Sequence, residues 1–318
     1  MYDINVPWPS SSYALEPSPA ELTNFYNTIA MLHSFGYNYL AINFIVDEAV
    51  KLPVNSPSKL NPVPMAELRK RFGAFSKLRL FSRITLVVSD PAKAQSILKI
   101  NNTGAFDIVA VQPTTEKALQ LTVTNLDIDL LSLPMASRLP FFLKHKTVGL
   151  ALAKGVKFEI CYSGLIAGPA GYESSTALGA SGHISRKNFF SNCLQLIRAS
   201  RCRGLVFSSG ATEPLHVRNY ADVLAIMNSL GLKVSNSKEG FLAHPESVLV
   251  KGRLRIKSHK QTVIVGDEAG TDSRAGALFG GEDSKNGVLD DYKKKKGAGK
   301  RSLEHQADRA KRVKTMSV

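Results

Sequence analysis

The sequence predicts an α/β protein: a TIM-like β/α barrel followed by a disordered basic C-terminal tail. Two observations carry this prediction. Short apolar runs alternate with helical segments through roughly the first 250 residues, as in a barrel of βα units. Beyond residue 255 the chain is rich in Gly, Ser, Asp and Lys and poor in large apolar side chains, so it cannot bury enough surface to offset chain entropy. We therefore predict a barrel domain over residues 1–255 and a tail over residues 256–318.

The predicted strands are short and apolar on both faces, as expected for buried parallel strands. They cover residues 2–6, 39–46, 84–88, 106–111, 128–133, 156–161, 204–208 and 232–235. A closed barrel accommodates this number of strands better than an open doubly wound sheet, which stays as the alternative architecture. The first turn, from Pro7 to Ser10, lacks the glycines of a dinucleotide-binding turn, and no P-loop motif is present. Nucleotide-cofactor chemistry is therefore not expected.

Most of the predicted helices lie between these strands and carry recognisable start signals. Ser18 precedes Pro19 and Glu21, which is the pattern of an N-cap with a capping box, and that helix runs to Gly36. Asp90 with Pro91 starts a second helix, which continues through Ala94, Ile97 and Leu98. Further helices are predicted from Thr115, over residues 141–155 and 185–203, from Asn219 to Leu230 with Gly231 after it, and over residues 244–256.

The helix predicted over residues 185–203 combines an apolar stripe with cations. Phe190, Cys193, Leu194 and Ile197 follow helical spacing, so we predict that they face inward. Lys187 and Arg198 lie about three turns apart beside this stripe. Cations in this arrangement can reach phosphates while the helix stays anchored. The alternative is an ordinary solvated helix surface.

The charge balance favours a polyanionic partner. Lys and Arg number 41 against 26 Asp and Glu, which gives a net charge of +15. Such an excess attracts phosphate chains, so nucleic acid is the expected partner class. No apolar run is long enough to span a membrane, and the N-terminal residues do not resemble a secretory signal, so we expect an intracellular protein without membrane contact. Cys161, Cys193 and Cys202 have neither disulfide-framework nor zinc-site spacing.

The predicted tail ends in two basic clusters. From Tyr292 onward, Lys and Arg exceed Asp and Glu by a net charge of +8. Such clusters are typical of nuclear localisation signals or RNA contacts, and the alternative is a merely solubilising tail. The cations concerned are Lys293, Lys294, Lys295, Lys296, Lys300, Arg301, Arg309, Lys311, Arg312 and Lys314.

Several ordered segments resemble the thirty-kilodalton protein subunit family of ribonuclease P and ribonuclease MRP. The resemblance covers nearly all of residues 1–255. It is carried by YDINVPW (2–8), SRITLVVSDP (82–91), FDIVAVQPTTEKAL (106–119), DIDLLSL (127–133), residues 139–166, residues 186–211 and PESVLVKGR (245–253).

The resemblance implies a barrel of the polymerase and histidinol phosphatase superfamily that acts as a scaffold in a ribonucleoprotein whose RNA is catalytic. The implied function is a non-catalytic, RNA-binding subunit that supports 5′-leader removal from precursor tRNA and also rRNA processing. The implied partners are ribonuclease P RNA, ribonuclease MRP RNA, precursor tRNA, small subunits of RNA-recognition-like fold and a second copy of the barrel protein. The implied location is the nucleus and nucleolus, and no cofactor is implied.

The related metal-dependent phosphatases begin with an Asp-x-His-x-His motif on the first strand. Here Asn5 and Pro7 stand at the two histidine positions after Asp3, and Pro offers no side-chain ligand. We therefore expect no metal site and no catalytic residue. A metal-dependent phosphoesterase with a degenerate motif is the rival hypothesis. Asp3 and Glu159 lie within apolar strands, so we predict that they point into the barrel and make structural ion pairs or backbone hydrogen bonds.

Two histidines are predicted at the mouth of the barrel, His183 in a Gly-rich loop and His216 after a strand. A catalytic role is not expected for either of them. The loop over residues 168–182 also supports a third hypothesis, in which it is the lid of a small-molecule enzyme. For the leading hypothesis, the predicted RNA contacts are Lys144, Lys146, Arg186, Lys187, Arg198, Arg201, Arg203, Lys251, Arg253 and Arg255.

Overall fold

The computed structural model describes residues 1–48, 50, 52–53, 56–90, 100–101, 103–168, 182–259 and 263–264. Residues Met1–Val265 form one compact unit. The predicted helix after Asp90, most of the predicted loop over residues 168–182 and the basic clusters of the tail lie outside the described residues. The domain boundary at residue 255 stays a prediction.

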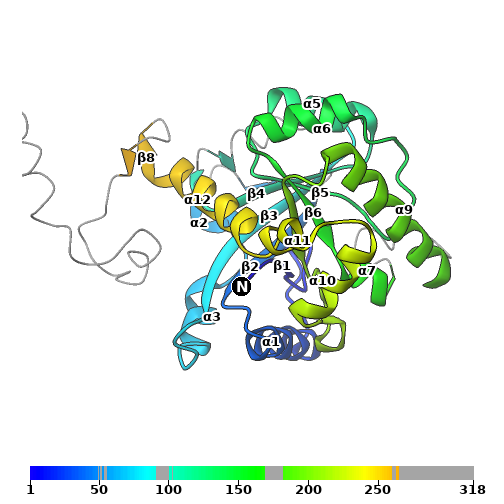
Figure 1. Ribbon diagram of the computed structural model, residues 1–318. Coiled ribbons are helices and arrows are strands. Elements are labelled where there is room, and N and C mark those ends of the chain that lie inside the picture. Colours follow the sequence, from blue (N-terminus) through cyan, green and yellow to red (C-terminus); the bar gives the residue numbers. More distant parts are fainter. Residues whose placement is uncertain are drawn as a thin grey trace, which may run out of the picture. The chain divides into compact units, whose positions relative to one another are not determined.

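The described strands form one parallel sheet of seven, in the order of the chain, which curls into a nearly closed barrel (Figure 1). The strands are β1 (Tyr2–Pro7), β2 (Tyr39–Asp47), β3 (Arg79–Val88), β4 (Ile108–Pro113), β5 (Leu130–Ser132), β6 (Lys157–Cys161) and β7 (Leu205–Ser208). The predicted TIM-like α/β fold is confirmed.

Eleven helical segments accompany the strands in the described part of the chain. They are α1 (Pro19–Ser34), α2 (Pro57–Leu60), α3 (Met65–Arg71), α5 (Glu116–Asn125), α6 (His145–Ala153), α7 (Ser163–Ile166), α9 (Gly182–Ser200), the 3₁₀ helix η2 (Pro214–His216), α10 (Tyr220–Ser229), α11 (Val234–Glu239) and α12 (Ala243–Lys257). The strands β8 (Ser258–His259) and β9 (Val263–Ile264) form a separate antiparallel pair. Within the described residues no helix is both long and apolar enough to cross a lipid bilayer.

The predicted start signals of three helices are confirmed by their hydrogen bonds. Ser18 caps α1 with a full capping box to Glu21. The Thr115 side chain accepts a hydrogen bond from Ala118 N at the start of α5, and the Asn219 side chain accepts one from Ala221 N at the start of α10. Gly231 follows α10 with a φ of 93°, a left-handed conformation that glycine adopts at low cost.

The predicted strand over residues 232–235 is wrong, because α11 begins at Val234. The gap between β7 and β1 is instead bridged by backbone groups of the turn that follows α11. Phe207 N donates to Gly240 O at 3.1 Å, and Tyr2 N donates to Phe241 O at 3.4 Å. Further along the seam, Gly210 N donates to Asn5 O at 3.0 Å. The barrel therefore closes without an eighth strand.

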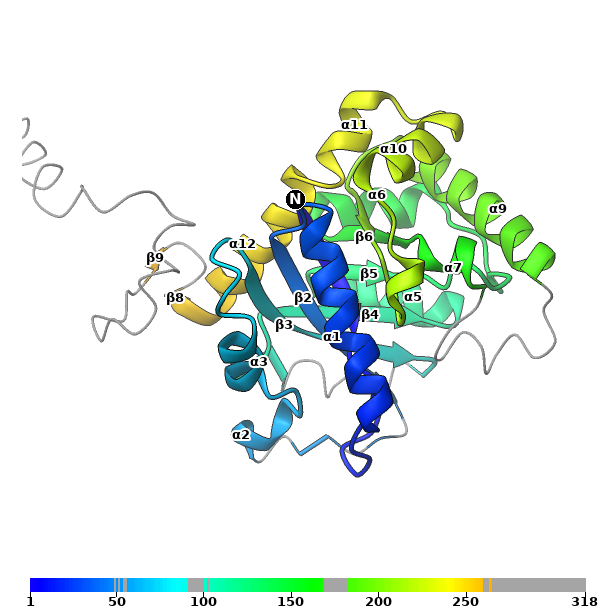
Figure 2. The same ribbon diagram turned by 90° about the horizontal axis from the view of Figure 1, so that it is seen from below.

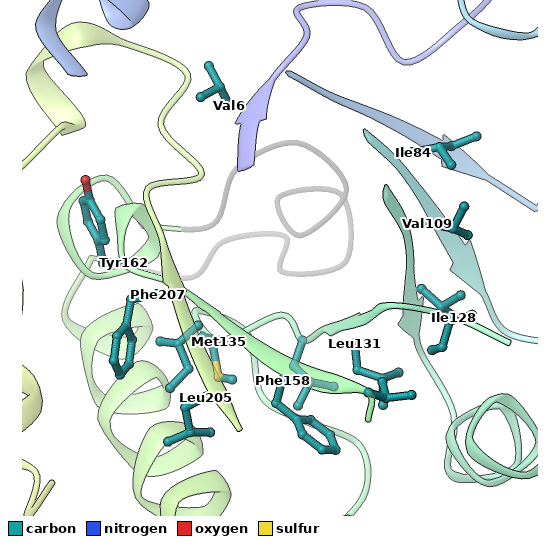
Figure 3. Close-up of a cluster of buried hydrophobic side chains, with 14 of the residues drawn as sticks. Val6, Ile84, Val109, Ile128, Leu131, Met135, Phe158, Tyr162, Leu205 and Phe207 are labelled. Carbon is teal, nitrogen blue, oxygen red and sulfur yellow. The ribbon is translucent and has the colours of Figure 1, made fainter. Parts of the chain in front are cut away.

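Side chains of the strands alternate between two environments. Outward-facing residues such as Ile84, Val109, Phe158 and Leu205 are buried beneath the helices and form the apolar core (Figure 3). The residues between them face the interior, where Arg83 from β3 meets Glu159 from β6 across the barrel. The interior is therefore polar at its centre, and most of the apolar packing lies between the barrel wall and the helices.

The inward face of α9 differs from the predicted stripe. Cys193 and Ile197 are buried as predicted, but Phe190 is 36% exposed and Leu194 is only partly buried. Phe189 and Leu196 take their places in the core. The polar Asn192 fixes this rotation of the helix, because its amide donates to Met135 O at 3.0 Å and to Ser137 O at 2.7 Å.

Candidate functional site

The centre of the barrel holds a buried ion pair. Arg83 and Glu159 are fully buried, and two guanidinium nitrogens contact the two carboxylate oxygens at 2.5 and 2.6 Å. Burial alone would raise the pKa of Glu159, but the Arg83 guanidinium outweighs it and holds that pKa below its usual range. Glu159 therefore stays charged and paired, and the predicted ion pair of this carboxylate is confirmed.

Asp3 is the second carboxylate that the sequence places inside the barrel. It accepts hydrogen bonds from Asn5 N and Ser209 N at 3.1 Å each, and the bond from Ser209 joins β1 to the end of β7. Burial raises its pKa to about 6, because these bonds only partly replace the water it has lost. The predicted backbone hydrogen bonds are confirmed, and Asp3 is part of the seam of the barrel.

A cavity of about 650 Å³ opens above this polar centre. Amide and hydroxyl side chains line its floor, among them Asn5, Asn43, Thr85 and Gln112. The charged residues of the described lining are Glu21, Asp47 and Glu213, and all of them are acidic. An acidic rim repels phosphate, so the mouth is a poor place for a nucleic-acid backbone.

The rival phosphoesterase hypothesis requires metal ligands at this mouth. Among the residues that the structure describes, no group of three or more His, Cys, Asp and Glu side chains lies together as ligands would. The Asn5 amide instead donates to Glu159 at 3.3 Å and accepts a hydrogen bond from the Asn43 amide at 2.7 Å. His216 lies 3.8 Å from Glu213 at the rim, and His183 is exposed in the first turn of α9. No observation on the described residues favours this rival.

Most of the candidate cations lie on α6 and α9 or directly after α9, which pack side by side on one flank of the barrel (Figure 2). Their side chains are exposed, and no acidic side chain among the described residues pairs with Lys146, Arg186, Lys187, Arg198, Arg201 or Arg203. Lys144 contacts Glu116 of α5 at 2.5 Å, but both side chains are exposed, so this pair contributes little stability. We call these seven cations the α6–α9 basic surface.

The two helices touch where their cations are densest. His145 Nδ1 lies 2.7 Å from Ala199 O, which joins the first turn of α6 to the last turn of α9. Arg201 and Cys202 then adopt left-handed conformations with φ of 55° and 61°, and Cys202 N donates to Ile197 O at 3.1 Å. This turn is unusual for residues with side chains and fixes the chain beyond the helix. Lys144 and Lys146 are thereby held close to the cations at the end of α9.

The remaining candidate cations lie on α12 and face acidic partners within the chain. Lys251 Nζ is 3.5 Å from Asp127, and Arg253 Nε is 4.0 Å from Asp107. Arg255 contacts Asp129 at 2.5 Å, with the arginine side chain 8% exposed. Asp107 and Asp129 also accept hydrogen bonds from Ser82 N and Val109 N, the backbone of the neighbouring strands. These cations hold α12 across the N-terminal ends of the strands, and their contact with RNA stays a prediction.

The fit of α12 against the barrel depends on a glycine. A Cβ atom at Gly252 would lie 1.9 Å from Asp107 O, which is a backbone atom that cannot rotate away. Burial raises the pKa of Asp129 despite the opposing effect of Arg255, and Asp129 Oδ1 has no hydrogen-bond partner. The junction between α12 and the barrel is therefore close-packed, and one oxygen of its buried Asp129 carboxylate lacks a hydrogen bond.

The sequence analysis did not predict which charged residues pair with one another inside the protein. It did not foresee Arg83 as the partner of Glu159, nor the aspartates beneath α12. A signal for the aspartates exists, since Asp107 and Asp129 each directly precede an apolar strand. It also missed Phe142, an exposed aromatic side chain beside the α6–α9 basic surface.

Comparison with known proteins identifies similar chains over the whole barrel. A family model described as RNase P subunit p30 matches residues 1–257, so the match ends where α12 ends. Ribonuclease P/MRP protein subunit RPP1 of Saccharomyces cerevisiae is 42% identical over 273 residues, which are 85% of this chain and 86% of that protein. The probable ribonuclease P protein subunit 3 of Schizosaccharomyces pombe is 28% identical over 258 residues, 81% of this chain and 96% of that protein.

Among solved structures, a chain in the cryo-EM structure of archaeal ribonuclease P with mature tRNA is similar in fold. Its TM-score is 0.55 at 17% sequence identity, and the match covers 84% of this chain and 99% of that one. At this identity the likeness bears on the fold alone, and it agrees with the barrel described above.

Proposed function

The chain belongs to the RNase P subunit p30 family, and on that premise we propose that it is a non-catalytic protein subunit of ribonuclease P and ribonuclease MRP that binds the RNA of these particles. In this role it supports removal of the 5′ leader from precursor tRNA and the processing of rRNA. The RNA of the particle would carry out the chemistry. This chain would hold the RNA in position and neutralise part of its charge. The same proposal places the particle in the nucleus and nucleolus. It also includes small subunits of RNA-recognition-like fold and a second copy of this chain as partners.

The observation that carries the RNA-binding proposal is the α6–α9 basic surface. Lys187 and Arg198 lie about three turns, or roughly 16 Å, apart on the exposed side of α9. Cations that already have buried acidic partners would lose those contacts on binding phosphate, whereas most cations of this surface have none to lose among the described residues. Contacts of this kind bind the phosphate backbone and position the RNA without reading its sequence.

The charge of the barrel mouth supports the same assignment, because it disfavours the alternative place for RNA. Its charged lining is acidic in the described residues, so phosphate binding there is opposed by charge. We therefore place the RNA on the flank formed by α6 and α9 and leave the mouth without an RNA contact.

The proposal is tested by reversing charge at Arg198 and Arg201 in the full chain and measuring its binding to transcribed ribonuclease P RNA over a range of salt concentrations. Loss of two phosphate contacts should weaken binding and reduce the slope of log K against log salt by about 1.4–1.8. The matched control reverses Lys70 and Lys77, which are exposed near α3 and change the net charge equally.

A control that weakens binding as much as the Arg198 and Arg201 variant would mean that net charge alone attracts the RNA. Wild-type affinity and salt slope in the Arg198 and Arg201 variant would refute the assignment of this surface. Thermal unfolding of each variant establishes that the barrel is intact.

A further inference from the structure

Phe142 is the most exposed large apolar side chain in the described part of the chain, at 80% of its full accessible surface. It lies just before α6, between Phe141 and Leu143, which are each only 6% exposed. The side chains of Phe141 and Leu143 point into the protein and anchor the backbone on both sides. The side chain of Phe142, between them, therefore points toward solvent. A single exposed apolar side chain is ordinary by itself, so the case for a partner rests on how this segment is held and on the charges near it.

The segment that carries Phe142 is fastened to α9 at both ends. Asn192 of α9 donates to Met135 O and Ser137 O on one side, and His145 on the other side contacts Ala199 O. Because these contacts exist within the isolated chain, the backbone that carries the ring loses little conformational freedom when the ring binds a partner.

Beyond its two buried neighbours, Phe142 is flanked along the chain by exposed cations. Arg138, Lys144 and Lys146 are exposed on either side of it. A protein interface is depleted of charged residues at its core, so a protein partner for this ring would have to bury it among several cations. An RNA partner neutralises the cations with phosphates and offers the planar face of a base to the ring.

We infer that Phe142 is a stacking platform for an unpaired RNA base whose flanking phosphates contact Arg138, Lys144 and Lys146. This inference rests on the proposed RNA-binding function and adds to it the kind of RNA that is bound, namely a single-stranded segment. Bases within a duplex are stacked and paired, so they are not available to the ring.

The test compares the full chain and its variants in binding to a single-stranded RNA oligonucleotide and to a duplex of the same sequence. Phe142→Ala should weaken single-strand binding about 5- to 150-fold, the range measured for loss of one base–aromatic stack. The salt slope should not change, because no charge is removed. Duplex binding should stay as in the wild type.

Two conservative variants separate stacking from simple apolar contact. Phe142→Tyr retains a ring and should bind like the wild type, whereas Phe142→Leu retains only apolar bulk and should bind like Phe142→Ala. An oligonucleotide containing 2-aminopurine supplies a direct signal, because its fluorescence is quenched when the base stacks on an aromatic ring. Leu15→Ala is the matched control, since Leu15 is 70% exposed and lies beside Glu16 instead of cations.

The failure of this inference differs from the failure of the proposed function. If Phe142→Ala binds single strands like the wild type while charge reversal at Arg198 and Arg201 still weakens binding, stacking is wrong and RNA binding stands. If Phe142→Leu restores binding, the ring makes an apolar contact, as in a protein interface, and the inference is overturned. If neither the Phe142 nor the arginine variants alter RNA affinity, both proposals are wrong.

Discussion

The cations of α9 and α12 show how the same residue types acquire different roles within one barrel. On α9, Lys187 and Arg198 are exposed and face no acidic partner among the described residues. On α12, Arg253 and Arg255 lie against aspartates that precede β4 and β5. The two helices lie in different places around the barrel in both views (Figures 1 and 2). The comparison teaches that the cations of a helix are available to an anionic partner only where the fold leaves their charge unneutralised.

The largest expected effect in this comparison comes from Arg255→Ala. Removing one member of a buried ion pair leaves Asp129 without its cation, which should lower the free energy of unfolding by about 3–5 kcal/mol. Arg198→Ala on α9 should change it by no more than about 0.5 kcal/mol. Urea unfolding followed by the fluorescence of the single tryptophan, Trp8, measures both.

A double variant sharpens this prediction. Asp129→Asn combined with Arg255→Met removes both charges and keeps an oxygen that accepts from Val109 N, so it should recover most of the lost stability. Equal stability losses for the Arg255 and Arg198 single variants would remove the distinction between the two helices.

The contrast between neutralised and unneutralised charge extends to the carboxylates inside the barrel. Glu159 has Arg83, whereas no cation contacts Asp3 among the described residues, and burial raises its pKa from 3.8 to about 6. A raised pKa means that the folded state binds the proton more tightly than the unfolded state. Stability from this group is therefore greatest below about pH 4 and is lost as the pH rises through about 6.

Asp3→Asn should remove this pH dependence and stabilise the protein at pH 7 by about 3 kcal/mol, because each pKa unit corresponds to about 1.4 kcal/mol. The asparagine oxygen can still accept from Ser209 N, so the seam keeps its contact. The measurement is the difference in unfolding free energy between variant and wild type at pH 4, 5, 6 and 7. A difference that does not vary with pH would show that burial does not raise the pKa of Asp3.

A smaller effect is expected from glycines on the helices of the comparison. Gly252→Ala should destabilise by about 1–3 kcal/mol, because the added Cβ would approach Asp107 O to 1.9 Å and push α12 from the barrel. Gly149→Ala on α6 is the matched control. Its Cβ would meet no atom within 4 Å, so the better helix propensity of alanine should stabilise by about 0.5–1 kcal/mol.

Thermal unfolding of the two alanine variants checks the signs of both effects. If both shift the midpoint in the same direction, the close approach of α12 to the barrel does not contribute as described.

The sequence by itself determined the alternation of strands and helices, the caps of α1, α5 and α10, and the absence of histidines at positions 5 and 7. These features depend on neighbours within one or two turns, and such spacing is visible in the chain. The stripe chosen on α9 shows the limit, because Phe189 and Phe190 both begin a stripe of helical period. Only the contacts of Asn192 with the 135–137 segment decide between them.

The tertiary structure alone decided which charges are neutralised. Arg83 and Glu159, like Arg255 and Asp129, are far apart in the sequence and meet because curling of the sheet and the crossing of α12 bring them together. The tertiary structure also shows why the predicted eighth strand does not form. Backbone groups near Phe241 already bridge β7 and β1. Local periodicity carries no information about such distant pairs, so the division between cations with acidic partners and cations without them is a property of the fold.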